Sequence, residues 1–237
     1  MLLAQLLDTL EAFHGPQKPN WPTDPYLFLV WWHSGYPQSD DRCAKGFESL
    51  RREIGVSPAH LLAADPRKLA GALKPGGMVP ELRAIRLREI AERVVREFNG
   101  DLRAGLSGKS VAQIRAALKK FHGIADAGAD RILLFGGISP VAAVPSNVAH
   151  VLARIKQGQE REVDRLTWGA TYRAAQEMIE ADVPEKFDPR MRAYLLLKVH
   201  GQALCKRTNP KCGECPVAGD CAFFSGKTRG RASAVRK

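Results

Sequence analysis

The stretch HGQALCKRTNPKCGECPVAGDC, residues 200–221, brings four cysteines close together near the end of the chain. They are separated by intervals of six, two and five residues, and the fifth cysteine, Cys43, lies far away in the sequence. Prolines and a glycine between them allow the segment to bend back on itself. Four thiolates at this spacing can surround one small metal centre. The four are Cys205, Cys212, Cys215 and Cys221.

Two kinds of centre suit this ligand set. Disulfides are a poor explanation, because the chain is basic and begins with a predicted amphipathic helix in place of an export signal. Four cysteines bind either zinc or an iron–sulfur cubane. Zinc sites usually pair two CxxC knuckles, and this segment has one, between Cys212 and Cys215. The spacing therefore favours a [4Fe–4S] cluster, with zinc as the alternative.

The charge balance of the chain indicates its partner. Lys and Arg total 36 against 25 Asp and Glu, which gives a net charge of +11 in 237 residues. A partner with a dense negative charge, such as nucleic acid, is the natural inference, although a ribosome-associated or simply basic protein is also consistent. Aromatic residues make up only 7% of the chain, which argues against a single-strand binder built on an aromatic platform.

Composition and periodicity predict an all-α fold. Hydrophobic residues account for 45% and charged residues for 26%, as in ordinary globular proteins. Apolar residues recur at helical spacing along 2–10 and 80–98, and the second segment starts with Pro80 and stops at Asn99-Gly100. Further helices are expected at about 110–121, 129–135, 146–156, 168–180 and 189–204. No window resembles a membrane span, so we expect no membrane partner and a cytoplasmic location, nucleoid-associated if bacterial. Nothing in the sequence suggests an obligate partner chain, so we expect a monomer.

The cysteine segment carries a family resemblance. The approach His200-Gly201-x-x-x-Cys205, followed by the intervals above, resembles the C-terminal iron–sulfur loop of endonuclease III-type DNA glycosylases. In that family the cluster is mainly structural and shapes a loop whose basic residues contact DNA phosphates. The resemblance therefore implies DNA contacts for Lys206, Arg207 and Lys211.

A second match lies where the family has its DNA-binding helix-hairpin-helix. Residues 121–133, FHGIADAGADRIL, resemble the hairpin and the start of its second helix. A tight turn exposes backbone N–H groups at a helix N-terminus, which suits a phosphate, and a glycine makes such a turn without steric cost. The residues implied to contact DNA are Gly123, Ile124, Ala125 and Gly128. Ala125 stands where the family has a second hairpin glycine.

The resemblance also implies the domain organisation. A six-helix domain is expected at 26–145, with the helix-hairpin-helix at about 112–135. A second helical domain, which holds the cluster, is expected from 1–25 and 146–225, with a cleft between the two domains for an extruded nucleotide. Residues 226–237 carry five basic residues and no acid, and we expect a disordered basic tail there.

The positions implied to be catalytic have changed. Bifunctional family members use a hairpin Lys to attack the sugar, and the matching residue is Ala127. The family's Asp, in the segment that resembles residues 143–154, corresponds to Pro145. Neither side chain can act as a nucleophile or exchange a proton. Weak substitutes nearby are Asp126, Asp130 and His150.

A turn near residues 36–40 resembles the family's turn that plugs the gap left by a flipped base, and Gln38 or Tyr36 is the expected wedge.

Together these features imply an endonuclease III-like base-excision-repair protein that binds damaged duplex DNA, with its Lys-dependent glycosylase and lyase chemistry weak or lost. Two alternatives stay open. One is a monofunctional DNA N-glycosylase for an unusual base, such as an alkylated one, and the other is a redox-sensing iron–sulfur DNA-binding protein.

Overall fold

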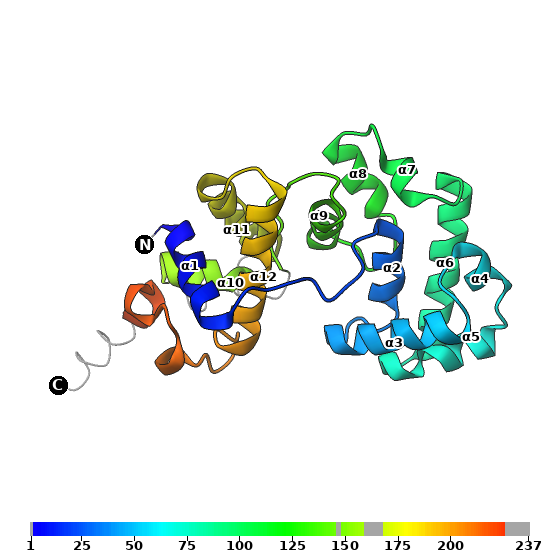
Figure 1. The fold of residues 1–237 in the computed structure, drawn as a ribbon, viewed down its shortest axis with the longest axis horizontal. Helices are drawn as coiled ribbons and strands as arrows, with labels where there is room; N and C mark the ends of the chain where they lie inside the picture. The colour runs from blue at the N-terminus through cyan, green and yellow to red at the C-terminus, as the bar shows by residue number, and fades with distance from the viewer. Residues whose placement is uncertain (1, 146–147, 159–167, 226–237) are drawn as a thin grey trace. The chain divides into compact units, whose positions relative to one another are not determined.

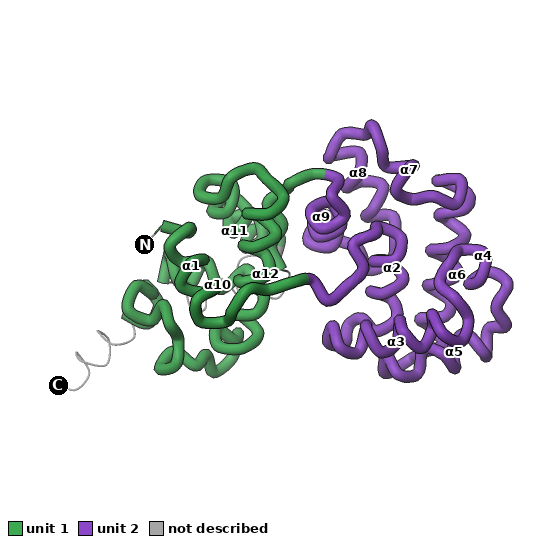
Figure 2. The backbone as a smooth tube through the Cα atoms, viewed as in Figure 1, with its two compact units in different colours: residues 1–18, 139–237 green, residues 19–138 purple. Residues whose placement is uncertain are grey.

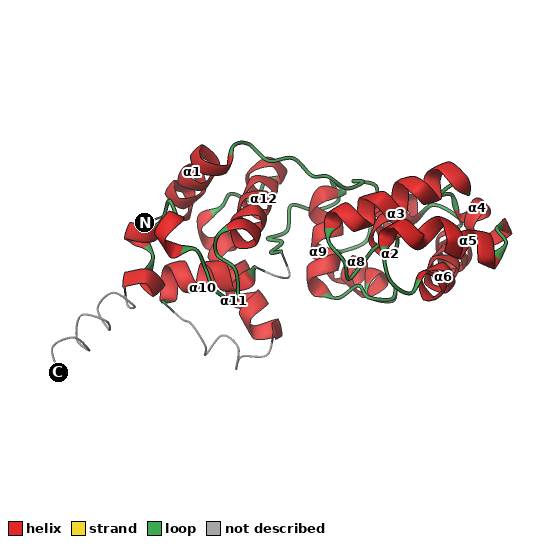
Figure 3. Ribbon diagram, turned by 90° about the horizontal axis from the view of Figure 1, so that it is seen from below, coloured by secondary structure: helices red, strands yellow, loops and turns green. Residues whose placement is uncertain are grey.

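The computed structural model describes residues 2–145, 148–158 and 168–225. The described part of the chain contains helices, turns and loops and no strand, which confirms the all-α prediction (Figure 3). The chain divides into two compact units, residues 1–18 with 139–237 and residues 19–138 (Figure 2). These divisions fall at 18/19 and 138/139, whereas the sequence placed the domain boundaries at 25/26 and 145/146. The predicted basic tail at 226–237 lies outside the described residues.

The first unit, called the terminal unit below, combines both ends of the chain. Its helices are α1 (Leu3–His14), α10 (Ala149–Gln157), α11 (Trp168–Asp182) and α12 (Phe187–Ala203), followed by the short turns η3 (Cys212–Glu214) and η4 (Ala218–Asp220) (Figure 1). Helix α1 packs against α12, and α10 packs against α11. Leu3, Leu6, Leu7 and Leu10 form the buried face of α1, as their spacing predicts.

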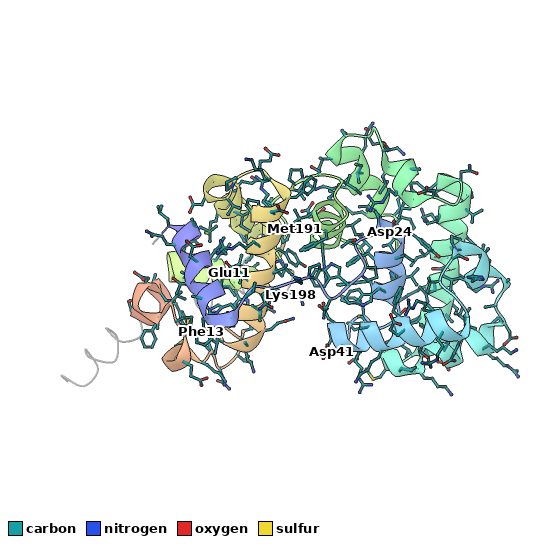
Figure 4. All side chains as sticks on the ribbon, viewed as in Figure 1. Glu11, Phe13, Asp24, Asp41, Met191 and Lys198 are labelled. Carbon is teal, nitrogen blue, oxygen red and sulfur yellow. The ribbon has the colours of Figure 1, made fainter. Side chains whose placement is uncertain are left out.

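A charged contact also joins α1 to α12. Arg192 on α12 donates to Glu11 through its Nε and Nη2 atoms at 2.9 and 2.7 Å, and to Asp8 at 2.8 Å. Glu11 is labelled on α1 in Figure 4. The N-terminal helix is therefore held in the terminal unit by a leucine face and by an ion-pair network.

The second unit, called the hairpin unit below, contains the helices from α2 to α9. They are α2 (Pro25–His33), α3 (Asp40–Glu53), α4 (Pro58–Ala63), α5 (Pro66–Leu73), η1 (Lys74–Gly76), α6 (Pro80–Phe98), α7 (Leu102–Leu106), α8 (Val111–Leu118) and α9 (Asp126–Phe135). The family's expected six-helix domain is more finely divided here, because α4, α5 and α7 are helices of only six, eight and five residues.

Helix α6 shows how the sequence ends these helices. It starts at Pro80 and ends before Asn99, which adopts a left-handed conformation with φ 50°, as the terminal signals predict. Helix α2 is capped by Asp24, which accepts hydrogen bonds from the backbone N–H groups of Tyr26 and Leu27 at 3.0 Å (Figure 4).

The core of the hairpin unit surrounds α2 and includes a buried arginine. The guanidinium carbon of Arg131 lies 3.7 Å from the centroid of the Trp21 ring, and Phe28, Trp31 and Trp32 lie within 5.7 Å of it. Asp40 lies 3.8 Å from the same guanidinium. Aromatic faces and one carboxylate thus compensate the burial of this charge and connect α9 to α2.

Candidate iron–sulfur centre and DNA-binding hairpin

The cysteine loop begins where α12 ends. The N–H groups of Leu204 and Cys205 both donate to the carbonyl of His200 at 2.9 Å, which closes the last turn. The chain then turns through η3 and η4. All four cysteines of the loop line one small pocket, together with Arg154, His200 and Phe223. The structure thus brings together the four residues that the sequence spacing grouped.

The free state of the cysteines limits the kind of cross-link that the loop can contain. All five cysteines of the chain are free thiols, so the loop is not a disulfide framework. Within the described ranges, no group of three or more His, Cys, Asp or Glu side chains is arranged around a single metal ion. Four free thiols that line one cavity are available as ligands to a metal centre.

Arg154 on α10 holds the backbone of the loop. Its Nη1 donates to the carbonyl of Lys206 at 2.7 Å, and its Nη2 donates to the carbonyl of Arg207 at 2.8 Å. Nη1 also lies 3.8 Å from the sulfur of Cys205. Burial raises the pKa of the Cys205 thiol, and the Arg154 guanidinium opposes this rise. Arg154 therefore acts both on the loop backbone and on a cluster ligand.

His150, four residues before Arg154 on the same helix, makes a second contact to the loop. Its Nε2 lies 2.8 Å from the carbonyl oxygen of Cys205. Because a carbonyl only accepts, Nε2 carries the proton. The sequence suggested His150 as a weak catalytic substitute, and the structure places it against the loop backbone.

His200 supports the cavity from α12 and is completely buried. Its Nε2 lies 3.7 Å from the Cys215 sulfur, and its Nδ1 lies 3.2 Å from His14 Nε2. If Cys215 binds the cluster as a thiolate, it would only accept, which would place the proton on His200 Nε2 and leave Nδ1 to accept from His14. Burial lowers the pKa of His200 to about 4, which keeps the ring neutral with one proton to donate.

The basic residues of the loop lie on its outer side. Lys206, Arg207 and Lys211 are exposed, and Lys211 forms an exposed ion pair with Glu214 at 3.4 Å. The carbonyls of Lys206 and Arg207 are fixed to Arg154, so their side chains extend from an anchored backbone. This arrangement offers positive charge to a phosphate backbone at low conformational cost.

The hairpin lies between α8 and α9. Ser110 caps α8, accepting from the N–H of Gln113 at 3.3 Å. Gly123 turns the chain with φ 69°, where a side chain would be strained. Ile124 is buried, and Ala125 starts α9 without a side-chain cap. Ala125 therefore does not cap the N–H groups in the first turn of α9. N–H groups without a capping side chain at a helix start can donate to a phosphate.

Gly128 lies in the first turn of α9, next to the hairpin. A Cβ added there would lie 3.4 Å from the Ile124 side chain, in ordinary contact. This packing holds Ile124 against the start of α9. The hairpin residues that the resemblance implies to contact DNA therefore lie together.

The two aspartates of the hairpin are in ion pairs. Asp126 lies 2.7 Å from Lys119 Nζ on the surface. Asp130 is 1% exposed and accepts from Arg115 Nε at 2.6 Å, which links α9 to α8. The Arg115 bond gives Asp130 a structural role in the hairpin.

The two positions that the resemblance implies to be catalytic are both buried. Ala127 is 7% exposed in the first turn of α9, and Pro145 is buried in the loop before α10. They belong to different units of the chain. In the turn near residues 36–40, where the resemblance places the residue that fills the gap of a flipped base, Tyr36 is exposed and Gln38 is partly buried.

Sequence reasoning missed the residues that support the loop. In the sequence, Arg154 and His200 stand out only as members of segments that resemble the family, residues 143–154 and 200–205. The i, i+4 spacing of His150 and Arg154 is the signal that places both on one face of α10.

Comparison with known proteins agrees with this site. Residues 205–221 match the iron–sulfur binding domain of endonuclease III. A thymine/uracil-DNA glycosylase from Pyrobaculum aerophilum is 29% identical over 77% of this chain and 73% of its own length. Endonuclease III from Thermotoga maritima is 24% identical over 88% of this chain and 87% of its own length.

Solved structures share the fold. A thermostable thymine-DNA glycosylase matches 94% of this chain and 96% of its own, with a TM-score of 0.73 and 18% identity. An endonuclease III–DNA complex matches 96% of this chain and 97% of its own, with a TM-score of 0.72 and 16% identity. The chain thus has the helix-hairpin-helix fold of these structures, and one segment of it matches the iron–sulfur binding domain of endonuclease III. Within that class, its relatives include both a thymine/uracil-DNA glycosylase and endonuclease III itself.

Within the described ranges, no helix is long and apolar enough to cross a membrane.

Proposed function

We propose that this protein acts in base excision repair by binding damaged duplex DNA, and that it has lost the Lys-dependent glycosylase and lyase chemistry of its family. The observation that carries the proposal is the hairpin itself. It has a glycine turn and an uncapped helix start, and a buried methyl group, that of Ala127, stands where the nucleophile would be.

The DNA-binding part rests on charge and geometry. The chain has a net charge of +11, and exposed Lys206 and Arg207 extend from a backbone that Arg154 anchors. The named relatives act on DNA, and two of the similar structures are endonuclease III–DNA complexes. These observations support binding to a phosphate backbone and favour a DNA partner over a ribosomal one.

We infer the loss of lyase chemistry because none of the substitute residues suggested by the sequence can replace the lysine nucleophile. Lysine-dependent cleavage needs a free amine to form a Schiff base with the sugar. Asp130 is paired with Arg115, Asp126 with Lys119, and His150 contacts the cysteine loop. None of these three groups offers an amine, and each has a structural partner.

The cluster is proposed to be [4Fe–4S], held by Cys205, Cys212, Cys215 and Cys221. When bound, it cross-links four points of the loop through iron–sulfur bonds. Arg154, His150 and His200 then orient the loop backbone and one ligand around it.

A monofunctional N-glycosylase is the second candidate. The observation that favours it is the similarity to a thymine/uracil-DNA glycosylase over most of the chain. A base that leaves easily, such as an alkylated purine, needs less acid–base help than a normal one.

End-labelled duplexes that carry an oxidised pyrimidine, an alkylated purine, a mismatched uracil or an abasic site test the proposal. Each is incubated with the holoprotein, treated with or without hot alkali, and assayed for binding in parallel. Binding without breaks supports a recognition role. In the duplexes that carry a damaged or mismatched base, breaks that need alkali support the second candidate. Breaks without alkali in any duplex overturn the loss of lyase chemistry, and the abasic duplex, which alkali cleaves by itself, tests only this step.

A further inference from the structure

A groove runs between α5 and α6 on the surface of the hairpin unit. Small residues line its middle, Ala70 and Gly71 from α5 and Ala84 from α6. A Cβ added to Gly71 would meet no atom within 4 Å, so the space above this residue is open. Ile85 of α6 lines the same groove and is 55% exposed. The groove therefore places an open space next to an exposed branched side chain.

Ile85 belongs to a group of exposed apolar side chains around the start of α6. Met78 lies just before the helix and is 70% exposed, and Leu82 lies in its first turn and is 41% exposed. Leu82 and Ile85 are three residues apart, so they are neighbours on the helix surface. Exposed apolar side chains that gather in this way are typical of an interaction surface.

The two walls of the groove carry opposite charge. Arg67 and Lys74 are seven residues apart on the groove face of α5, and Glu81 and Glu92 are eleven residues apart on the groove face of α6. All four side chains are exposed. Among the residues that the structure describes, none of the four has an ion-pair partner.

The two helices run past each other in opposite directions. Lys74 directly follows α5 and is separated from the start of α6 only by a short turn. At the other end, Arg88 of α6 donates to the carbonyl of Ala64, just before α5, at 3.0 Å. Glu81 therefore shares one end of the groove with Lys74, and the other end holds Arg67. The guanidinium of Arg88 is held by the backbone, so the α6 wall presents mainly its acids.

We propose that this groove is the interface of a homodimer, in which a second copy of the chain covers it around a two-fold axis along the groove. A half turn about that axis places α5 of the second copy on α6 of the first and leaves positions along the groove unchanged. Lys74 of each copy then faces Glu81 of the other, and Arg67 faces Glu92. Each basic wall thus meets an acidic wall at both ends of the groove.

The apolar contact fits the same arrangement. Ile85 lies one turn after Glu81, and Gly71 lies one turn before Lys74, so the two are at the same level along the groove. In the dimer, Ile85 of each copy fills the open space above Gly71 of the other. One surface therefore supplies both the projecting side chain and the space that receives it, as a two-fold interface requires.

A second copy fits the groove better than nucleic acid does. The acids of α6 would repel a phosphate backbone, whereas the chain itself carries the complementary pattern of charge. In the hairpin unit, α5 and α9 lie at opposite ends in both views (Figures 1 and 3), so a dimer through the groove leaves the candidate DNA-binding hairpin uncovered. A dimer departs from the monomer that the sequence predicts, because the two walls meet only in the folded unit.

Sedimentation equilibrium of the DNA-free holoprotein over a range of concentrations tests the dimer. We expect a monomer–dimer equilibrium in the micromolar range, as for interfaces of the smaller size class. Lys74→Glu and Glu81→Lys should each weaken dimerisation by about tenfold or more, because each places like charges opposite one another at two symmetric positions. The double variant Lys74→Glu with Glu81→Lys restores opposite charges and should restore the wild-type dissociation constant.

The apolar contact is tested with a matched pair of substitutions on α6. Ile85→Ser removes the projecting side chain and should weaken dimerisation by about tenfold or more. Val95→Ser is the control and should leave it unchanged, because Val95 is also branched and 46% exposed but lies outside the groove. All of these positions are exposed, so the thermal midpoint of the dilute protein should stay close to that of the wild type.

A monomer at every concentration would overturn the proposal, and so would a dimer that Ile85→Ser and the charge variants leave unchanged. A double charge variant that dimerises as weakly as the single variants would overturn the facing of Lys74 and Glu81, and an equal loss in Val95→Ser would overturn the place of the interface. Association that requires added DNA or a different protein would show that the occupant is not a second copy. DNA binding is measured separately, and its absence would leave the dimer standing.

Discussion

Arg154 Nη2 donates to the carbonyl oxygen of Arg207 at 2.8 Å, so a buried side chain of α10 fixes the backbone of an exposed basic residue in the cysteine loop. The same guanidinium holds the carbonyl of Lys206 and approaches the Cys205 sulfur. The proposed cluster site and the proposed DNA-contacting residues therefore share one support, and a change at Arg154 should affect both.

Replacing Arg154 with Met should destabilise the loop. The substitution removes the donor from the two carbonyls, and each lost hydrogen bond costs about 1 kcal/mol. We expect a lower thermal midpoint and less iron per chain, measured by calorimetry and iron assay. Arg52→Met removes an arginine that is exposed and pairs only on the surface, and it should change neither quantity. Full iron content and an unchanged midpoint in Arg154→Met would contradict the supporting role.

Replacing Cys212 with Ser should remove iron and weaken DNA binding, because one cluster ligand is lost and the loop is no longer cross-linked. Iron per chain and the DNA dissociation constant are the measurements. Cys43→Ala is the control, because Cys43 is buried in the hairpin unit, where burial raises its thiol pKa to about 12. A Cys212→Ser protein with normal iron and normal binding would show that Cys212 is not a ligand.

DNA affinity should fall steeply with salt, by at least about tenfold between about 50 and 200 mM, because phosphate contacts release counterions. Arg207→Ala should reduce the slope of log affinity against log salt by about 1, the contribution of one phosphate contact. Lys68→Ala removes an exposed charge from α5 and should leave the slope unchanged. A wild-type affinity that is independent of salt would be inconsistent with the basic loop as a DNA contact.

The hairpin unit should lose stability in acid through His33. Burial lowers the pKa of His33 to about 4, below its ordinary value of 6.5, so the unfolded chain takes up the proton first as pH falls. The stabilisation from the neutral ring is complete above about pH 6.5, declines as pH falls towards about 4, and amounts to about 3 kcal/mol.

Urea unfolding followed by tryptophan fluorescence at pH 7.5 and 5 measures this effect, since Trp21, Trp31 and Trp32 lie in the hairpin unit. His33→Gln should flatten the pH dependence. His60→Gln, which changes an exposed histidine, should keep it. Equal pH dependence in wild type and His33→Gln would contradict the assignment.

The sequence predicted most of the architecture. Helix α6 has the predicted bounds because Pro80 and Asn99 are strong terminal signals, and the four cysteines meet because the loop is short. Helix α9 starts at Asp126, three residues before its predicted start, because Ala125 can begin a helix in the hairpin without a side-chain cap.

Other features depend on contacts between residues distant in sequence. The bonds from Arg154 to residues 206 and 207 span about fifty positions, and the pairing of Arg115 with Asp130 requires the hairpin to be folded. Local patterns do not contain these contacts, so the sequence alone does not distinguish Arg154 from the other basic residues of the chain.

The most direct test of the account is borohydride trapping on a duplex that carries an abasic site. A lysine nucleophile forms a Schiff base that borohydride reduces to a stable protein–DNA adduct, and the buried methyl group of Ala127 cannot. The account predicts that the holoprotein binds this duplex and yields no adduct, while a lysine-bearing endonuclease III yields one under the same conditions. A trapped adduct from this protein would contradict the loss of Lys-dependent chemistry.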